Sequence, residues 1–146
     1  MTDYRVVPPG GGEQLQVRGS TLLFKAVADT TAGKFSLHER RMPAGGRRPP
    51  AHLHPDRVEA FWVLDGTAEF ELDGELVTAG QGTFVLVPGG VAHTFGAGAE
   101  ADAHVLVLHA GALDGYFREL AALWAGDQPP GPEAERALMR AHGMRL

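Results

Sequence analysis

The sequence contains no cysteine among its 146 residues. Disulfide bonds and thiolate metal sites are therefore excluded, and any bound metal must be held by His, Asp or Glu. The chain also lacks an apolar run long enough to cross a bilayer. Its N-terminus lacks the basic start and apolar stretch of a signal peptide. We therefore expect a cytoplasmic protein with no membrane partner.

Positive charge is scarce relative to negative charge. Lys and Arg together number 13, Asp and Glu number 18, and the formal net charge is −5. Nucleic-acid binding requires a clustered positive surface, so no nucleic-acid partner is expected. Arg40, Arg41, Arg47 and Arg48 form one local basic cluster. A solvated loop and strand edge is the favoured interpretation, and a rim that attracts anionic ligands is the alternative.

Glycine and proline punctuate the chain, with 20 and 10 residues respectively. Between them lie short runs rich in Val, Leu, Phe and Thr, which predict an all-β sandwich or barrel. The length suits a single domain over 1–146, with a barrel core at about 13–111 and a helical segment at about 112–146. The expected strands are 15–17, 21–27, 34–42, 58–64, 67–72, 75–78, 83–87, 93–95 and 103–109.

Two Asp-Gly pairs separate three of these strands. Asp65-Gly66 follows 58–64, and Asp73-Gly74 follows 67–72. Asp-Gly is typical of the two-residue type I′ turn, which needs positive φ at both positions. The three strands are therefore predicted to form an antiparallel meander.

The end of the chain changes from strand to helix patterning. Apolar residues recur with helical spacing from Leu113 to Trp124. Asp114 stands near the start, where a negative charge favours the helix dipole. A proline-rich break at 128–132 precedes a second helix at 133–142. We expect these two C-terminal helices to pack on the outside of the barrel.

Three histidines and one glutamate are the candidate metal ligands of the sequence. His52 and His54 are two residues apart, so an extended chain points both imidazoles to one face. Glu59 returns on the next strand after a turn at Pro55-Asp56, and His93 arrives after the meander. Such a set suits Fe, Mn, Co, Ni or Zn and leaves coordination positions open.

The spacing of these residues resembles the two motifs of the cupin superfamily. The first motif is Gly, five residues, His-x-His, three or four residues, Glu, six residues and Gly, matched by Gly46, His52, His54, Glu59 and Gly66. The second ends in Asn in the family, and here it is matched by Gly82, Pro88, Gly90 and His93, with Ala97 at the Asn position. Residues 31–45 and 106–120 show a weaker resemblance, to small quercetin-dioxygenase-like cupins.

The resemblance implies a double-stranded β-helix, a jelly-roll-like barrel, that binds one divalent transition metal. Fe²⁺ is favoured, and Mn²⁺, Ni²⁺ or Zn²⁺ are possible. The metal ligands are expected to be His52, His54, Glu59 and His93.

Strand parity gives further candidates for the site. His38 shares a face with Ser36 and Arg40 and is a candidate proton-transfer residue, although a satisfied buried polar group is the favoured interpretation. Phe61, Val63 and Phe95 share parity with Glu59 or His93, and they are expected to line an apolar substrate pocket or to form ordinary core.

Other residues of the same strands are placed by the same alternation. His104 and His109 lie on opposite faces of one strand, so at most one of them faces the cavity. Trp62 is expected on the face of its strand opposite Phe61.

The resemblance implies a metal-dependent protein that acts on a small organic molecule. The preferred hypothesis is a dioxygenase-type oxidoreductase, in which Glu59 is both a metal ligand and a proton shuttle. A polyketide cyclase or isomerase that uses the metal as a Lewis acid is one alternative, and a non-catalytic binding protein is another. The open strand edges of a small barrel favour a homodimer.

Overall fold

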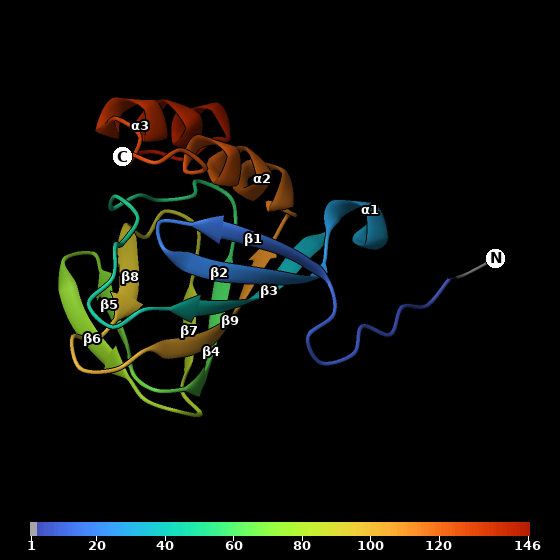
Figure 1. Ribbon diagram of the computed structural model, residues 1–146, viewed down its shortest axis with the longest axis horizontal. Coiled ribbons are helices and arrows are strands. Elements are labelled where there is room, and N and C mark those ends of the chain that lie inside the picture. The colour runs from blue at the N-terminus through green and yellow to red at the C-terminus, as the bar shows by residue number, and fades with distance from the viewer. Residues whose placement is uncertain (1–2) are drawn as a thin grey trace.

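Two antiparallel sheets make up the barrel in the computed structural model, which describes residues 3–146 (Figure 1). The larger sheet has the order β1-β2-β3-β9-β4-β7, and the smaller has the order β6-β5-β8. The strands are β1 (Glu13–Val17), β2 (Ser20–Ala26), β3 (Phe35–Met42), β4 (Glu59–Asp65), β5 (Ala68–Leu72), β6 (Glu75–Ala79), β7 (Phe84–Val87), β8 (His93–Ala97) and β9 (Ala103–Ala110). The predicted all-β barrel is confirmed.

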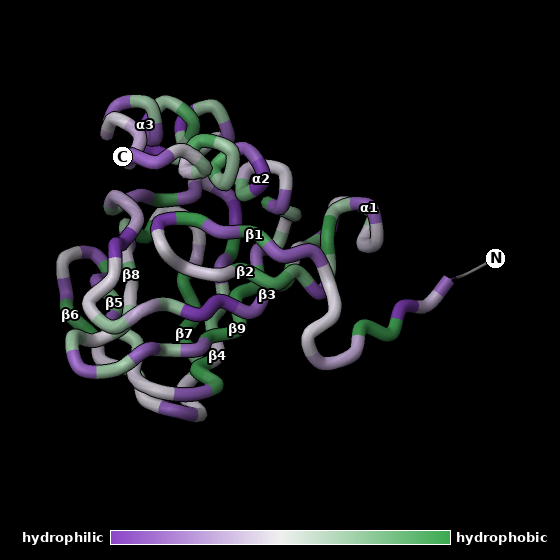
Figure 2. The backbone as a smooth tube through the Cα atoms, viewed as in Figure 1, coloured by the Kyte–Doolittle hydropathy of each residue, from purple (hydrophilic) through white to green (hydrophobic). Residues whose placement is uncertain are grey.

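Strand alternation fills the space between the two sheets. In β4, Phe61 and Val63 are buried, whereas Trp62 between them is 46% exposed, as its parity predicts. The Phe61 ring lies 4.9 Å from Phe70 and 4.8 Å from Phe95, both of the smaller sheet. Apolar residues of the two sheets therefore face one another across the barrel. Figure 2 shows hydrophobic residues, in green, along strands such as β4, β7 and β9.

The two Asp-Gly turns differ from each other. Asp73 and Gly74 have φ values of 48° and 81° and join β5 to β6 as a hairpin, as predicted. The predicted meander is wrong at Asp65-Gly66, because the two strands that this turn joins, β4 and β5, belong to different sheets. At Gly66 an added Cβ would lie 2.3 Å from the Asp102 carbonyl oxygen, so close backbone approach requires glycine there.

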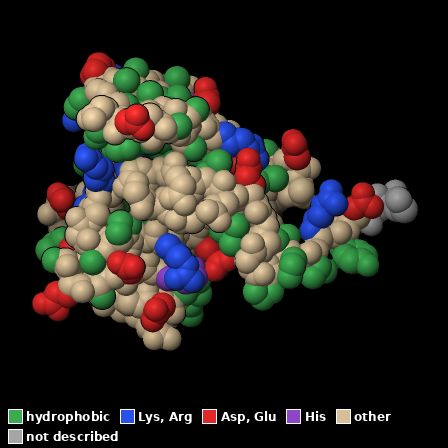
Figure 3. Space-filling view, viewed as in Figure 1, with side chains coloured by type: hydrophobic (Ala, Val, Ile, Leu, Met, Phe, Trp, Pro, Cys, Tyr) green, Lys and Arg blue, Asp and Glu red, His purple; other side chains and the backbone are tan. Residues whose placement is uncertain are grey.

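Two C-terminal helices, α2 (Asp114–Leu123) and α3 (Pro132–Ala141), pack on the outside of the barrel, as the sequence predicts, and they lie over β1 and β2 (Figure 1). A second apolar cluster joins them to the barrel, and in the space-filling view they form a layer above it (Figure 3). Its buried members are Val17, Leu22, Phe24, Leu113, Tyr116, Phe117, Leu120, Met139 and Met144. The short helix α1 (Ala28–Thr31) has no counterpart in the predicted elements.

No helix within residues 3–146 is both long enough and apolar enough to span a bilayer.

The outer face of the larger sheet has an apolar patch formed by β3, β4, β7 and β9. Phe84 and Leu86 are 56% and 54% exposed there, and the hollow between the strands has only apolar neighbours. Those neighbours are Leu37, Ala60, Phe61, Trp62, Phe84, Leu106 and Leu108. The homodimer stays a prediction, and an apolar face of this kind is the surface that a second copy would bury.

Phe84→Glu tests the homodimer, because a charge on this apolar patch opposes its burial. We expect the native protein to sediment as a dimer and the variant as a monomer at micromolar concentration. Glu75→Gln, on a strand of the other sheet, is the control and should leave the mass unchanged. A native monomer would contradict the prediction.

Candidate metal centre

The four candidate ligands come from three places in the chain. His52 and His54 lie on the loop that leads into β4, Glu59 begins β4, and His93 begins β8. The backbones of His52 and His93 exchange two hydrogen bonds, of 3.1 and 2.8 Å. This bridge joins the loop to β8, so two segments distant in sequence present their imidazoles together.

The ligand atoms form a tight, buried cluster. One donor atom from each of His52, His54, Glu59 and His93 lies within 4.8 Å of the other three. The Glu59 Oε2 atom is 2.7 Å from His93 Nε2 and 3.4 Å from His54 Nε2. All four side chains are buried. The structure therefore brings together the four residues expected from the sequence.

Backbone carbonyls set the orientation of two imidazoles. His52 Nδ1 lies 2.8 Å from the Pro50 carbonyl oxygen, and His93 Nδ1 lies 2.9 Å from the Val91 carbonyl oxygen. A carbonyl oxygen only accepts, so each Nδ1 carries the hydrogen and each Nε2 has a free lone pair. Metal-binding histidines are commonly held in this way.

The lone pairs converge on a place that a cation would fill. His93 Nε2 and Glu59 Oε2 are both acceptors when the imidazole is neutral, and 2.7 Å is too close for two acceptors without a proton or cation between them. The buried His54 Nε2 atom makes no hydrogen bond. The donor set therefore fits a divalent transition metal held by three imidazoles and one carboxylate.

Burial and mutual charge set the protonation states. Burial, followed by the positive potential of His93, lowers the pKa of His52 to about 3. Burial alone would raise the pKa of Glu59, but His109 and the other imidazoles hold it well below its usual range. Burial opposes the charged form of His93, but the hydrogen bond to Glu59 raises its pKa. Before metal binding, a proton therefore competes mainly for His93.

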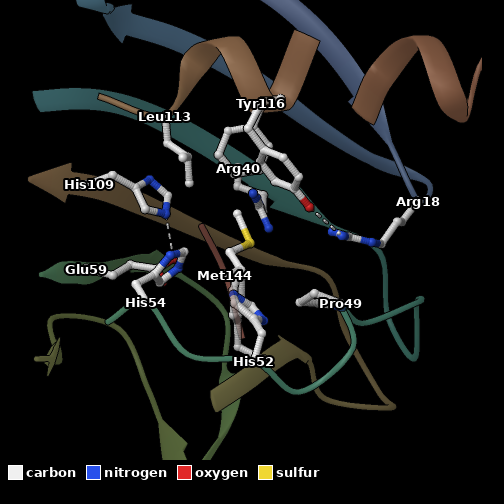
Figure 4. Close-up of a pocket in the computed structure, with 12 residues that line it drawn as sticks. Arg18, Arg40, Pro49, His52, His54, Glu59, His109, Leu113, Tyr116 and Met144 are labelled. Atoms are coloured by element: carbon white, nitrogen blue, oxygen red, sulfur yellow. Dashed lines mark hydrogen bonds and ion pairs between the residues drawn. The ribbon is translucent and has the colours of Figure 1, made fainter. Parts of the chain in front are cut away.

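His109 is a residue of the centre that sequence reasoning did not assign. It pairs with Glu59 across β9 and β4, and its Nε2 atom lies 3.0 Å from Glu59 Oε1 (Figure 4). His104, on the other face of β9, pairs instead with Glu39 at 3.0 Å. The expectation that at most one of these two histidines faces the cavity is thus met. His109 holds one carboxylate oxygen while the other faces the ligand cluster.

His38 lies behind His109 and outside the cavity wall. Its ring is stacked at 6.2 Å from His109, and it contacts Phe24 at 4.9 Å and Phe117 at 5.2 Å. The side chain is completely buried, and neither ring nitrogen has a hydrogen-bond partner. Burial, with Arg40 next in importance, lowers the pKa of His38 well below its usual range. This position is that of a neutral imidazole in apolar packing.

We expect His38→Phe to stabilise the metal-free protein by about 1–3 kcal/mol, because two unsatisfied buried nitrogens are removed. The gain should grow as pH falls through about 6.5, since the unfolded chain protonates His38 and the folded chain does not. Urea unfolding at pH 7.5 and 5.5 measures both effects. His104→Asn on the outer face is the control. A marked loss of stability in His38→Phe would show that the imidazole is hydrogen-bonded and necessary.

A small cavity lies beside the ligand cluster. Its free volume of about 20 Å³ is room for roughly one water molecule. Figure 4 shows side chains of the turn after β1, of β3, β4 and β9, of the ligand loop, of α2 and the residue before it, and of the C-terminal segment around it. The lining residues are Arg18, Arg40, Pro49, His52, His54, Glu59, Phe95, His109, Leu113, Tyr116, Phe117 and Met144.

Of the three expected wall residues, only Phe95 lines this cavity. Phe61 and Val63 lie in the core cluster between the sheets. The alternation of residues along a strand predicts which face a side chain is on, but not how far along the strand it lies from the cavity. Because β4 begins at Glu59, the residues after it run away from the cavity.

Comparison with known proteins identifies the fold family. A model described as a cupin domain matches residues 38–109, which contain all four ligands and His109. The chain belongs to the cupin superfamily. This cupin is 27% identical over 121 residues to a quercetin 2,3-dioxygenase of Bacillus subtilis, covering 83% of this chain. The chain spans only 36% of the length of that relative.

Solved cupin structures share the same architecture. The polyketide cyclase RemF from Streptomyces resistomycificus superposes with a TM-score of 0.63 at 21% identity, over 73% of this chain and 79% of that one. A predicted oxalate decarboxylase from Thermotoga maritima gives 0.64 at 19% identity, over 75% and 100%. At this identity the likeness concerns the fold.

Proposed function

We propose that this cupin is a metal-dependent, dioxygenase-type oxidoreductase that acts on a small organic molecule. The observation that carries the proposal is the buried cluster of His52, His54, Glu59 and His93 beside a small cavity. Four protein ligands leave coordination positions free in a six-coordinate ion, and the cavity lies next to them. A redox-capable metal in this place would polarise a substrate oxygen and bring O₂ alongside.

The surrounding side chains have two roles in this proposal. Glu59 Oε1 is held at 3.0 Å by His109, so a proton can move between the carboxylate and this imidazole. Leu113, Phe117 and Met144 form apolar walls that keep bulk water from the reacting atoms. The quercetin 2,3-dioxygenase relative supports the reaction class but no particular substrate, because the chain spans a minor part of its length.

Oxygen consumption tests the proposal. Protein loaded with Fe²⁺ is incubated with a flavonol or an enolisable 1,3-diketone, aerobically and anaerobically. We expect O₂ uptake in proportion to product, loss of both in Glu59→Gln, and retention of both in Glu39→Gln, whose carboxylate lies on the outer face of β3. Identical products with and without O₂ would refute the oxygenase.

Lewis-acid cyclisation or isomerisation is the second candidate function. The guanidinium of Arg40 lines the same cavity as the ligands, and a cation there stabilises an enolate with no change of oxidation state. The likeness to the fold of a polyketide cyclase is compatible with this chemistry. Full activity with redox-inactive Zn²⁺ under anaerobic conditions would favour this candidate over the oxygenase.

A further inference from the structure

Arg40 is a buried cation that forms no ion pair with any carboxylate in the part of the chain that the structure describes. Its residue is 4% exposed, its Nε atom has no hydrogen-bond partner, and its guanidinium lines the cavity. Within residues 3–146 it takes part in none of the ion pairs. Its contacts are instead the faces of Phe95 at 5.0 Å and Phe117 at 5.2 Å. Cation–π contacts only partly replace the hydration that burial removes.

Arg18, whose guanidinium also lines the cavity, has the hydrogen-bond and ion-pair partners that Arg40 lacks. Arg18 lies on the turn between β1 and β2 and forms a buried ion pair with Glu135 of α3. It also lies 3.4 Å from the Tyr116 hydroxyl, as Figure 4 shows. Glu135 is thus already engaged by Arg18, and it does not line the cavity. Arg40 keeps its positive charge at neutral pH, because burial lowers its pKa only to about 10.

The charges around the cavity are unbalanced. Glu59 is the only carboxylate among the residues that line it, and three imidazoles and His109 surround that carboxylate. Arg40 therefore shares its one nearby negative charge with the ligand cluster. A divalent cation at the ligands would leave the cavity with excess positive charge. Such a site favours an anionic guest over a neutral one.

A basic cleft of about 320 Å³ lies next to the cavity and shares Arg18 with it. Arg47, Arg48 and Arg136 line this cleft, with Glu135 as its only carboxylate. Trp124 and several prolines supply apolar surface, and Arg47 lies 5.4 Å over the Trp124 ring. Of the local basic cluster in the sequence, Arg47 and Arg48 line the cleft, Arg40 lines the cavity, and Arg41 is exposed on the outer face of β3.

We propose that the cavity binds the carboxylate group of a small organic acid, with Arg40 as the residue that holds the anion. The free volume of about 20 Å³ admits roughly one water-sized group, such as a carboxylate oxygen beside Arg40, and the cleft gives a place for the rest of the acid and a positive approach. A guanidinium pairs with a carboxylate through two parallel hydrogen bonds, which a cation–π contact does not provide. The inference rests on the proposed function in taking this acid as the substrate of the metal centre.

Acetate and acetamide test the inference, since the two have the same shape and differ in charge. Both are titrated by NMR into the metal-free protein, where an anion cannot be held by direct coordination to a metal. Arg40→Met removes the charge and retains an unbranched side chain, and Arg40→Lys restores the charge without the two-pronged geometry. Arg41→Met, the next residue on the outer face of the same strand, is the matched control.

We expect native protein and Arg41→Met to bind acetate more tightly than acetamide. Arg40→Met should weaken acetate binding at least about tenfold and leave acetamide binding unchanged. The acetate affinity of Arg40→Lys should lie between those of native protein and Arg40→Met. If circular dichroism shows Arg40→Met to be unfolded, Arg40→Lys is the variant compared with native protein. Equal acetate affinity in native protein and the Arg40 variant, or no preference for acetate in native protein, would overturn the inference.

The outcomes separate this inference from the proposed function. Arg40-dependent acetate binding without any O₂ uptake refutes the oxygenase and leaves the anion site standing. O₂ uptake together with acetate binding that does not change in the Arg40 variants supports the oxygenase and refutes the anion site.

Discussion

His93→Ala is expected to abolish the stabilisation of this protein by divalent metal. A metal that binds only the folded chain stabilises it by about 4 kcal/mol at a concentration a thousandfold above Kd. His93 contributes an Nε2 lone pair 2.7 Å from Glu59 Oε2, at the centre of the ligand cluster. Its loss should lower metal affinity by more than the roughly 10–100-fold seen when an outer partner of a ligand is removed.

The measurement is urea unfolding of native protein and variant, each with Zn²⁺ and with a chelator. Because His93→Ala also leaves a hole in buried packing, the informative quantity is the difference that metal makes within each protein. His104→Ala, on the outer face of β9, should keep the full difference. An undiminished metal effect in His93→Ala would place the metal elsewhere.

Phe61→Ala is expected to lower the free energy of unfolding by about 3–5 kcal/mol, because it opens a cavity in close packing. The Phe61 side chain is 1% exposed and packs its ring against Phe70 and Phe95. Trp62→Ala, at the neighbouring exposed position, is the control and should cost markedly less. Chemical denaturation of the metal-free proteins gives both values.

The same variant separates a core residue from a wall residue. Phe61 does not line the cavity, so Phe61→Ala should leave metal affinity within about threefold of native wherever the protein remains folded. If Phe61→Ala unfolds with a free energy close to native but binds ligand or substrate differently, Phe61 is a residue of the pocket wall, as strand parity suggests, and not of the core.

Much of the fold follows from local patterns in the sequence. The strands and the two C-terminal helices lie where alternation and helical spacing predict them, since each pattern is complete within a few residues. The hairpin expected at Asp65-Gly66 is wrong because a turn dipeptide does not reveal which sheet the next strand joins. Helix α1 escaped prediction because its four residues are too few to show a period.

The site was predictable only where its residues follow a spacing. His52, His54, Glu59 and His93 stand at motif positions, and the structure gathers them. The contact of His109 with Glu59 depends on the register between β9 and β4, which no local pattern contains. The unpaired state of Arg40 likewise depends on which carboxylates the fold places near it, and Glu59 is the one carboxylate among the cavity-lining residues.

Elemental mass spectrometry of the protein purified without a metal-affinity tag tests the central claim most directly. We predict about one Fe, Mn, Ni or Zn ion per chain, and its loss in His52→Ala and Glu59→Ala. Fe, Mn or Ni would favour O₂ chemistry, and Zn would favour the Lewis-acid alternative. Native protein that holds no metal, and takes none up on reconstitution, would contradict the metal centre.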